Sequence, residues 1–217
     1  MNRRPIRLLT AALTASAALL LTACGSGGGD DDSSPDKIEG AGGGSSKTSA
    51  SPSAKPGGAE RPEVELPDSF QADFAGWRDS DPKKQAILDD GKERLKAEYL
   101  AIIDADPQAK AVSFYTSQQA LTTSRTYIKG YVDNNHDLVG KARVFNPQVS
   151  ISDTGGGVLF YCVDESKGYT LDRKTKEKTG TPDDVNPVLQ YRTTLKKTSE
   201  GVWSTVSLQT VRGGCDK

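Results

Sequence analysis

The sequence predicts one α+β domain, in which N-terminal helices pack on a curved antiparallel meander sheet, preceded by a signal peptide and a disordered linker. Three observations predict this fold class: apolar residues at helical spacing from 82 to 132, a period of two after residue 140, and turn signals between the later segments. Helices followed by consecutive strands are typical of an α+β roll with the helices on one face. We expect the domain to occupy residues 68–217.

The helices are predicted from capping and periodicity. Asp81-Pro82 is an N-cap followed by proline at the first helical position, so the first helix is expected from about 82 to 104, with charged residues filling its exposed face. A short second helix precedes a third, which ends at Asn134-Asn135. Apolar and small residues recur at helical spacing in these three segments: Leu88, Leu95, Tyr99, Ile102, Val112, Tyr115, Leu121, Ser124, Tyr127, Ile128, Tyr131 and Val132.

Four strands are predicted after residue 140. Residues 143–152, 188–195 and 202–211 alternate apolar and polar positions, which indicates strands with one buried face. Residues 158–163 (VLFYCV) are apolar throughout, as for a strand covered on both faces. Glycine- and proline-containing turns separate the strands, and this order predicts an antiparallel meander.

The N-terminus has the composition of a secretory signal peptide over residues 1–23. Arg3, Arg4 and Arg7 form a basic start, and the apolar run from Leu8 to Leu21 is shorter than the roughly 20 residues of a spanning helix. The pair Arg3-Arg4 is a feature of signal peptides for twin-arginine export, but the residues that usually flank such a pair are missing.

Residues 21–24, Leu-Thr-Ala-Cys, resemble the lipobox of bacterial lipoproteins. The resemblance implies cleavage between Ala23 and Cys24, a diacylated Cys24 and a location on the outer face of the bacterial cytoplasmic membrane. Two or three acyl chains anchor a protein stably, whereas one does not. The alternative is an ordinary cleavage site with an incidental cysteine.

Residues 24–67 follow as the lipidated cysteine and a tether rich in Gly, Ser, Pro and Asp. A segment with so few core-forming residues does not offset its ordering entropy, so we expect it to be disordered. A flexible coil of this length spans about 35 Å, which is enough to carry a domain clear of the lipid headgroups.

The folded part has balanced charge. Residues 1–23 hold three of the 28 bases, and residues 24–67 hold four bases and eight of the 29 acids, which leaves 21 of each in residues 68–217. A neutral domain gives no electrostatic reason to bind nucleic acid. The basic cluster in residues 172–180 is interpreted as the solvated tip of a hairpin.

Three cysteines are present, and Cys24 is assigned to lipid. Cys162 and Cys215 therefore remain in an exported, oxidising setting, where a pair is by default a disulfide. A disulfide that closes the loop between residues 162 and 215 stabilises a fold by roughly 4 kcal/mol in the chain-entropy model. The alternative is a nucleophilic Cys162, which needs a base, and His136 is the sole histidine.

Two resemblances follow from these features. The order of helix, short helix, helix and four long strands resembles the nuclear transport factor 2-like (cystatin-like) roll. The chain also resembles a group of secreted actinobacterial lipoproteins. The matching residues are the run Cys162-Val163-Asp164, then Ser166, and Cys215 after a strand with Trp203. That resemblance covers residues 80–217. It implies the fold and the Cys162–Cys215 disulfide, and it implies no activity.

Enzymes with this roll, such as ketosteroid isomerases and dehydratases, use an Asp or His base with a Tyr donor inside the cone between sheet and helices. The weak candidates in this chain are Asp164, Tyr161 and Tyr191, and then Tyr127, Tyr131 and His136. Strand alternation places Asp164 on the Cys162 face near the end of its strand, His136 falls in a polar turn, and the tyrosines are at core spacing. The sequence thus assigns no catalytic residue. It carries no metal-ligand, phosphate-binding or cofactor motif either.

The first functional hypothesis is a non-catalytic, lipid-anchored protein that binds a small apolar ligand or an envelope partner. The second is an isomerase or dehydratase that uses the cone, which requires a carboxylate and a Tyr hydroxyl within hydrogen-bond reach. The third is a structural or assembly role.

Overall fold

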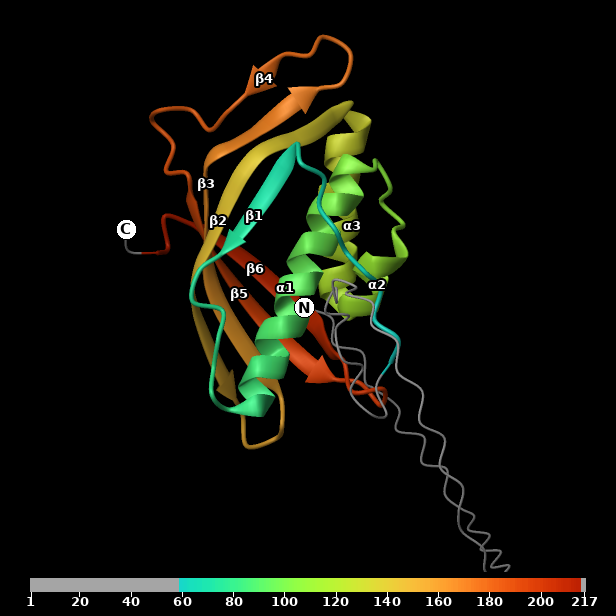
Figure 1. Cartoon of the computed structure of the whole chain (residues 1–217), viewed down its shortest axis with the longest axis vertical. Helices are drawn as coiled ribbons and strands as arrows, with labels where there is room; N and C mark the ends of the chain where they lie inside the picture. The colour runs from blue at the N-terminus through green and yellow to red at the C-terminus, as the bar shows by residue number, and fades with distance from the viewer. Residues whose placement is uncertain (1–58, 216–217) are drawn as a thin grey trace, which may run out of the picture. The chain divides into compact units, whose positions relative to one another are not determined.

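Three helices cover one face of a curved sheet in the computed structural model, which describes residues 59–215 (Figure 1). The predicted signal peptide, its cleavage site, Cys24 and the tether up to residue 58 lie outside the described residues. The α+β fold class is confirmed. The elements in chain order are β1 (Phe70–Phe74), α1 (Pro82–Ile103), α2 (Lys110–Tyr115), α3 (Gln118–Asp133), β2 (His136–Ile151), β3 (Gly157–Asp172), β4 (Lys178–Thr179), β5 (Val188–Lys197) and β6 (Trp203–Arg212).

The sheet has the strand order β1-β2-β3-β5-β6, with the short β4 paired to β3. Strands β2, β3, β5 and β6 form the predicted antiparallel meander. Strand β1 was not predicted, and it pairs in parallel with β2, from Phe70 opposite Gly140 to Phe74 opposite Val144. The sheet is therefore mixed, because residues before the helices return to its edge.

Helix α1 begins as its cap predicts. The Asp81 carboxylate accepts hydrogen bonds from the backbone N–H groups of Lys83 (2.7 Å) and Lys84 (3.4 Å). At the other end, the Arg173 guanidinium donates to the carbonyl oxygens of Ile102 (2.9 Å) and Ile103 (2.8 Å). Arg173, predicted as part of a solvated hairpin tip, instead satisfies the last carbonyls of this helix. Within residues 59–215, none of the helices is long and apolar enough to cross a bilayer.

A line of charged residues on α1 is buried, contrary to the expectation that the charged face meets solvent. Asp90, Arg94 and Glu98 stand four residues apart and are 1%, 2% and 3% exposed. The helix also approaches β3 closely, since a Cβ atom at Gly91 would lie 2.6 Å from Leu159 Cδ2. The helix therefore presents an apolar stripe and a polar line to the interior.

Residues 59–67 were predicted as the end of the disordered tether, and the structure contradicts this prediction. Val64 is 2% exposed and belongs to the main core. Arg61 forms an ion pair with the buried Asp90, with 2.9 Å between Nε and Oδ1. Asp90 also accepts a hydrogen bond from the Trp203 backbone N–H (2.8 Å). Ala59 and Leu66 also pack against this core. Composition did not predict this packing, because it depends on a few apolar side chains and on a partner, Asp90, that is distant in sequence.

The opposite face of the sheet carries the disulfide. Cys162 on β3 and Cys215 at the C-terminus are bonded, with their Cα atoms 6.2 Å apart. They form a small second cluster with Val188, against which Phe145 packs. Phe160 on this face is 38% exposed, so the expectation that residues 158–163 are covered on both faces fails at this position. The bond fixes Cys215 to an inner strand.

Replacing both cysteines, as Cys162→Ala with Cys215→Ala, is expected to lower the free energy of unfolding by about 2–4 kcal/mol, because the bond removes loop-closure entropy from the unfolded chain. Urea unfolding followed by circular dichroism measures this change. Cys24→Ser alone is the control and should leave the midpoint unchanged. An unchanged midpoint for the double variant would contradict the predicted stabilisation.

Candidate functional site

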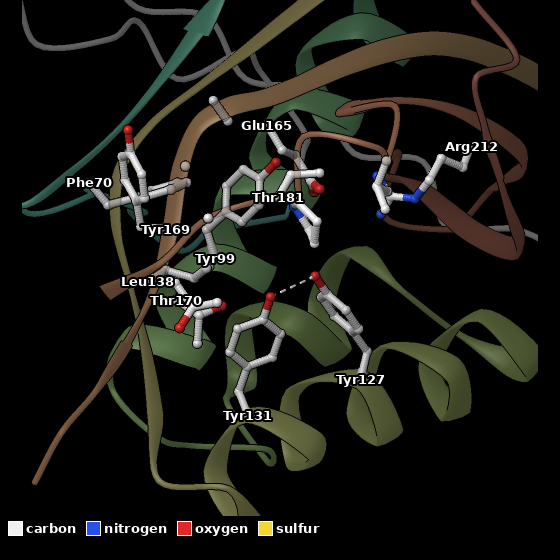
Figure 2. Close-up of a pocket in the computed structure, with 16 residues that line it drawn as sticks. Phe70, Tyr99, Tyr127, Tyr131, Leu138, Glu165, Tyr169, Thr170, Thr181 and Arg212 are labelled. Atoms are coloured by element: carbon white, nitrogen blue, oxygen red, sulfur yellow. Dashed lines mark hydrogen bonds between the residues drawn. The ribbon is translucent and has the colours of Figure 1, made fainter. Parts of the chain in front are cut away.

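The cone between α3 and the sheet contains two adjoining pockets. The first, which we call the hairpin pocket, has a volume of about 200 Å³ and lies beside the β3–β4 hairpin. The second, which we call the sheet pocket, has a volume of about 310 Å³ and is bounded by α1, α3, β5 and β6. Both pockets are lined by Tyr127, Tyr131, Glu165 and Arg212. Figure 2 shows these residues in the hairpin pocket. These four residues mark where the two pockets meet.

Two of the four residues that line both pockets are tyrosines. Tyr127 and Tyr131 are one turn apart on α3, their ring centroids are 5.3 Å apart, and their hydroxyl oxygens are 3.3 Å apart. Tyr99 of α1 lines the hairpin pocket, and burial raises the pKa of its phenol well above the usual value. Within residues 59–215 the Tyr99 hydroxyl has no hydrogen-bond partner. These tyrosines combine apolar ring surface with hydroxyl groups.

Glu165 is the carboxylate at the junction of the pockets. Strand β3 places Glu165 and Ser166 opposite Ala142 alone, because Asp164 pairs with Arg143 and Lys167 pairs with Lys141. Such a bulge bends a strand and re-aims its side chains, and bulges are frequent beside active sites. Burial raises the pKa of the Glu165 carboxyl, and Asp164 raises it further, while Arg212 lowers it. The bulge therefore holds an acid in a partly apolar site.

Sequence reasoning missed Glu165. Alternation on β3 assigns Tyr161, Val163 and residue 165 to one face, so the pattern contained a signal for its position. Residues 158–163 before it are all apolar, so no alternation of apolar and polar residues marks the face on which Glu165 lies. The predicted end of the strand near Asp164 was also wrong, because β3 continues to Asp172.

A buried polar cluster forms one side of the sheet pocket. The Arg94 guanidinium pairs with Glu98 through Oε2 and donates to Ser124 Oγ (3.2 Å) and the Tyr161 hydroxyl (3.2 Å). Ser124 in turn donates to Glu98 Oε2 (2.5 Å). Burial alone would lower the pKa of Arg94, but Glu98 and the tyrosines raise it overall, so the guanidinium stays charged. Glu98 and Ser124 line the sheet pocket, so the cluster meets the cavity.

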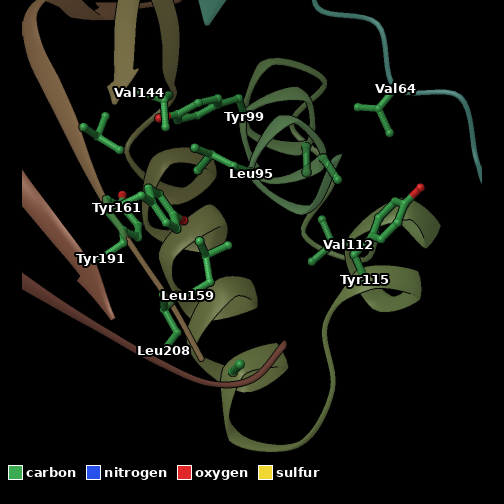
Figure 3. Packing of buried hydrophobic residues seen from close by; sticks show 14 of the residues in the cluster. Val64, Leu95, Tyr99, Val112, Tyr115, Val144, Leu159, Tyr161, Tyr191 and Leu208 are labelled. Carbon is green, nitrogen blue, oxygen red and sulfur yellow. The ribbon is translucent and has the colours of Figure 1, made fainter. Parts of the chain in front are cut away.

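The candidates Tyr161 and Tyr191 are mainly core residues, as their spacing predicted. Their rings stack with centroids 4.9 Å apart (Figure 3). Trp77 packs edge-on against Tyr161. Burial raises the pKa of Tyr161 to about 12, and Arg94 opposes this rise. Tyr191 also lines the sheet pocket, so one of the two tyrosines contributes to both core and cavity.

Two other candidates lie away from both pockets. Asp164 is partly exposed, and its Oδ1 accepts a hydrogen bond from the Ser166 backbone N–H (2.9 Å). His136 was expected in a polar turn, but it is the first residue of β2 and pairs with Asp172. Within the part of the chain that the structure describes, no three His, Cys, Asp or Glu side chains are grouped to hold a metal ion.

Comparisons with known proteins identify no family. No family model matches the chain, and no curated protein matches its sequence. Among solved structures, the intermembrane space region of chloroplast protein ARC6 has a TM-score of 0.41 and 9% identity, covering 59% of this chain and 96% of that chain. ActVI-ORFA from Streptomyces coelicolor has a TM-score of 0.42 and 6% identity, covering 60% and 98%. Aln2 from a Streptomyces species has a TM-score of 0.43 and 10% identity, covering 62% of this chain and 94% of that chain. Similarity at this level carries no argument about function.

The raised pKa of Glu165 makes stability depend on pH with a definite sign. The folded state holds this proton more tightly than the unfolded chain, so the stabilisation from Glu165 is present below its ordinary pKa of 4.5 and is lost as pH rises through the folded-state value. Glu165→Gln removes this dependence. The unfolding free energy of the variant minus that of the wild type is therefore expected to increase from pH 4 to pH 7 in urea titrations. A pH-independent difference would contradict the assignment.

Proposed function

We propose that this protein is a lipid-anchored, extracytoplasmic binding module that holds a small, mainly apolar molecule in its cone. The observation that carries the binding role is the pair of adjoining pockets, which share Tyr127 and Tyr131 and the charged residues Glu165 and Arg212. The sheet pocket, at about 310 Å³, reaches the size range of small-molecule sites. Such sites combine apolar and aromatic walls with a few polar groups, and Glu98, Glu165 and Arg212 are the charged groups of this one.

The location rests on the sequence. The basic start, the short apolar run and Leu-Thr-Ala-Cys at residues 21–24 support export, cleavage before Cys24 and lipidation of that cysteine. The Cys-Val-Asp-x-Ser run from Cys162 supports the same setting through its resemblance to secreted actinobacterial lipoproteins. A binding module held at the membrane surface takes its ligand from the envelope. The alternative to a small ligand is an envelope protein as the binding partner.

Lipidation at Cys24 predicts that the protein expressed in a bacterium with lipoprotein processing incorporates an alkyne-labelled palmitate and partitions into detergent. Cys24→Ser is expected to abolish the label and the partitioning, because serine has no thiol to acylate. The control Cys162→Ala should keep the label. Label retained in Cys24→Ser would contradict lipidation at this residue.

Ligand binding in the sheet pocket is tested with a bulky side chain at its rim. Thr210 on β6 is exposed and lines the pocket, whereas the neighbouring Gln209 is exposed and does not line it. Thr210→Trp is therefore expected to weaken binding of naphthalene-type probes at least tenfold, while Gln209→Trp binds as wild type does. Isothermal calorimetry on the chain from residue 24 onward, with Cys24→Ser, measures both. Equal affinities in the two variants would place binding elsewhere.

Proton-transfer catalysis of the isomerase or dehydratase type is the second candidate function, and Glu165 is the observation that favours it. A carboxylate with a raised pKa beside tyrosines suits a general base. Within residues 59–215, however, no tyrosine hydroxyl is hydrogen-bonded to Glu165, so the geometry required of this reading is not formed. Exchange of the α-hydrogens of cyclic ketones in heavy water, lost in Glu165→Gln, would favour the enzyme over the binding module.

A further inference from the structure

Glu98 offers the sheet pocket a fixed hydrogen-bond acceptor. Its carboxylate is held through Oε2 alone, by Arg94 and Ser124. No residue of 59–215 donates a hydrogen bond to Oε1. Glu98 is 3% exposed and lines the sheet pocket, so a molecule in this pocket can reach an oxygen whose position the protein has already set. A preorganised acceptor of this kind is matched by a ligand that carries a donor.

The charges around this oxygen favour a neutral donor over a cation. The buried Arg94 guanidinium already neutralises Glu98. The remaining charged groups that line the pocket, Glu165 and Arg212, are of opposite sign. A ligand ammonium would add an uncompensated charge next to a buried guanidinium, which is costly in a site of low polarity. A hydroxyl group donates to Oε1 without adding charge.

The walls and the volume specify the body of the ligand. The rings of Tyr127, Tyr131 and Tyr191, together with Leu189 and Leu208, line the pocket. An apolar cavity of about 150 Å³ accommodates benzene. The sheet pocket has about twice that volume, which suits two fused rings. Flat aromatic ligands also gain from stacked or edge-on contacts with tyrosine rings.

We propose that the sheet pocket binds a neutral two-ring aromatic alcohol whose hydroxyl donates a hydrogen bond to Glu98 Oε1. This inference rests on the proposed binding function and names its ligand class. The tyrosine rings contact the rings of the ligand, and Glu98, held by Arg94 and Ser124, accepts the hydrogen bond from its hydroxyl.

Three probes of similar size test the inference on the chain from residue 24 onward with Cys24→Ser. They are 2-naphthol, which has the donor, 2-methoxynaphthalene, which lacks it, and 1-naphthylmethylammonium, which is charged. We expect 2-naphthol to bind at least tenfold more tightly than either of the others in isothermal calorimetry, because hydrogen bonds to charged groups are among the stronger ones.

Glu98→Gln is expected to remove most of the preference for 2-naphthol over 2-methoxynaphthalene. Glu93→Gln is the matched control on the same helix, because Glu93 pairs with Lys96 and lines neither pocket. Circular dichroism checks that each variant folds. If Glu98→Gln does not fold, the comparison of the three probes on the unsubstituted site still tests the neutral, hydroxyl-bearing ligand class, which equal binding or tightest binding of the ammonium would overturn.

Each outcome has one meaning. Equal binding of 2-naphthol and 2-methoxynaphthalene would overturn the assignment of Glu98 and leave the binding function intact. Tightest binding of the ammonium would overturn the neutral ligand class. Binding of none of the three probes would overturn both this inference and the proposed binding function. A preference for 2-naphthol that survives in a folded Glu98→Gln variant would place the hydroxyl at another group.

Discussion

The buried guanidinium of Arg94 is the constraint on which the interior of this domain depends. A charge at 2% exposure is tolerated only if it is paired and hydrogen-bonded, and removing one partner of such a pair costs about 3–5 kcal/mol. Its partners come from three elements: Glu98 on its own helix, Ser124 on α3 and Tyr161 on β3. The contacts of this one charge therefore join both long helices to the sheet.

The same cluster divides the cone. Tyr161 stacks on Tyr191 and contacts Trp77, so this part of the cone is filled by the protein's own aromatic side chains. Beyond the cluster, the bulge at Glu165 and the tyrosines of α3 leave the two pockets open. The domain thus uses part of its interior for packing and part for a cavity, and the boundary between them is polar.

Residues distant in sequence close the fold at its edges. Asp90, one turn before Arg94, joins the N-terminal segment through Arg61 and the β6 backbone through Trp203. The disulfide fixes Cys215 on the other face of the sheet. Strand β1 adds a parallel edge to β2 from residues that precede the first helix. Each of these contacts adds to the interactions that the meander strands and the helices make in the core.

The sequence by itself determined the helices, the meander and the pairing of Cys162 with Cys215. Caps and periodicity act between near neighbours, and only two cysteines remained once Cys24 was assigned to lipid. The tertiary structure alone decided that Arg94 and Glu98 are buried, that Glu165 enters the cone and that residues 59–67 pack on the core. The physical reason is distance along the chain. Tyr161 lies 67 residues from Arg94, and Ser124 lies 26 from Glu98, so no local pattern shows whether a charged residue will find its partners.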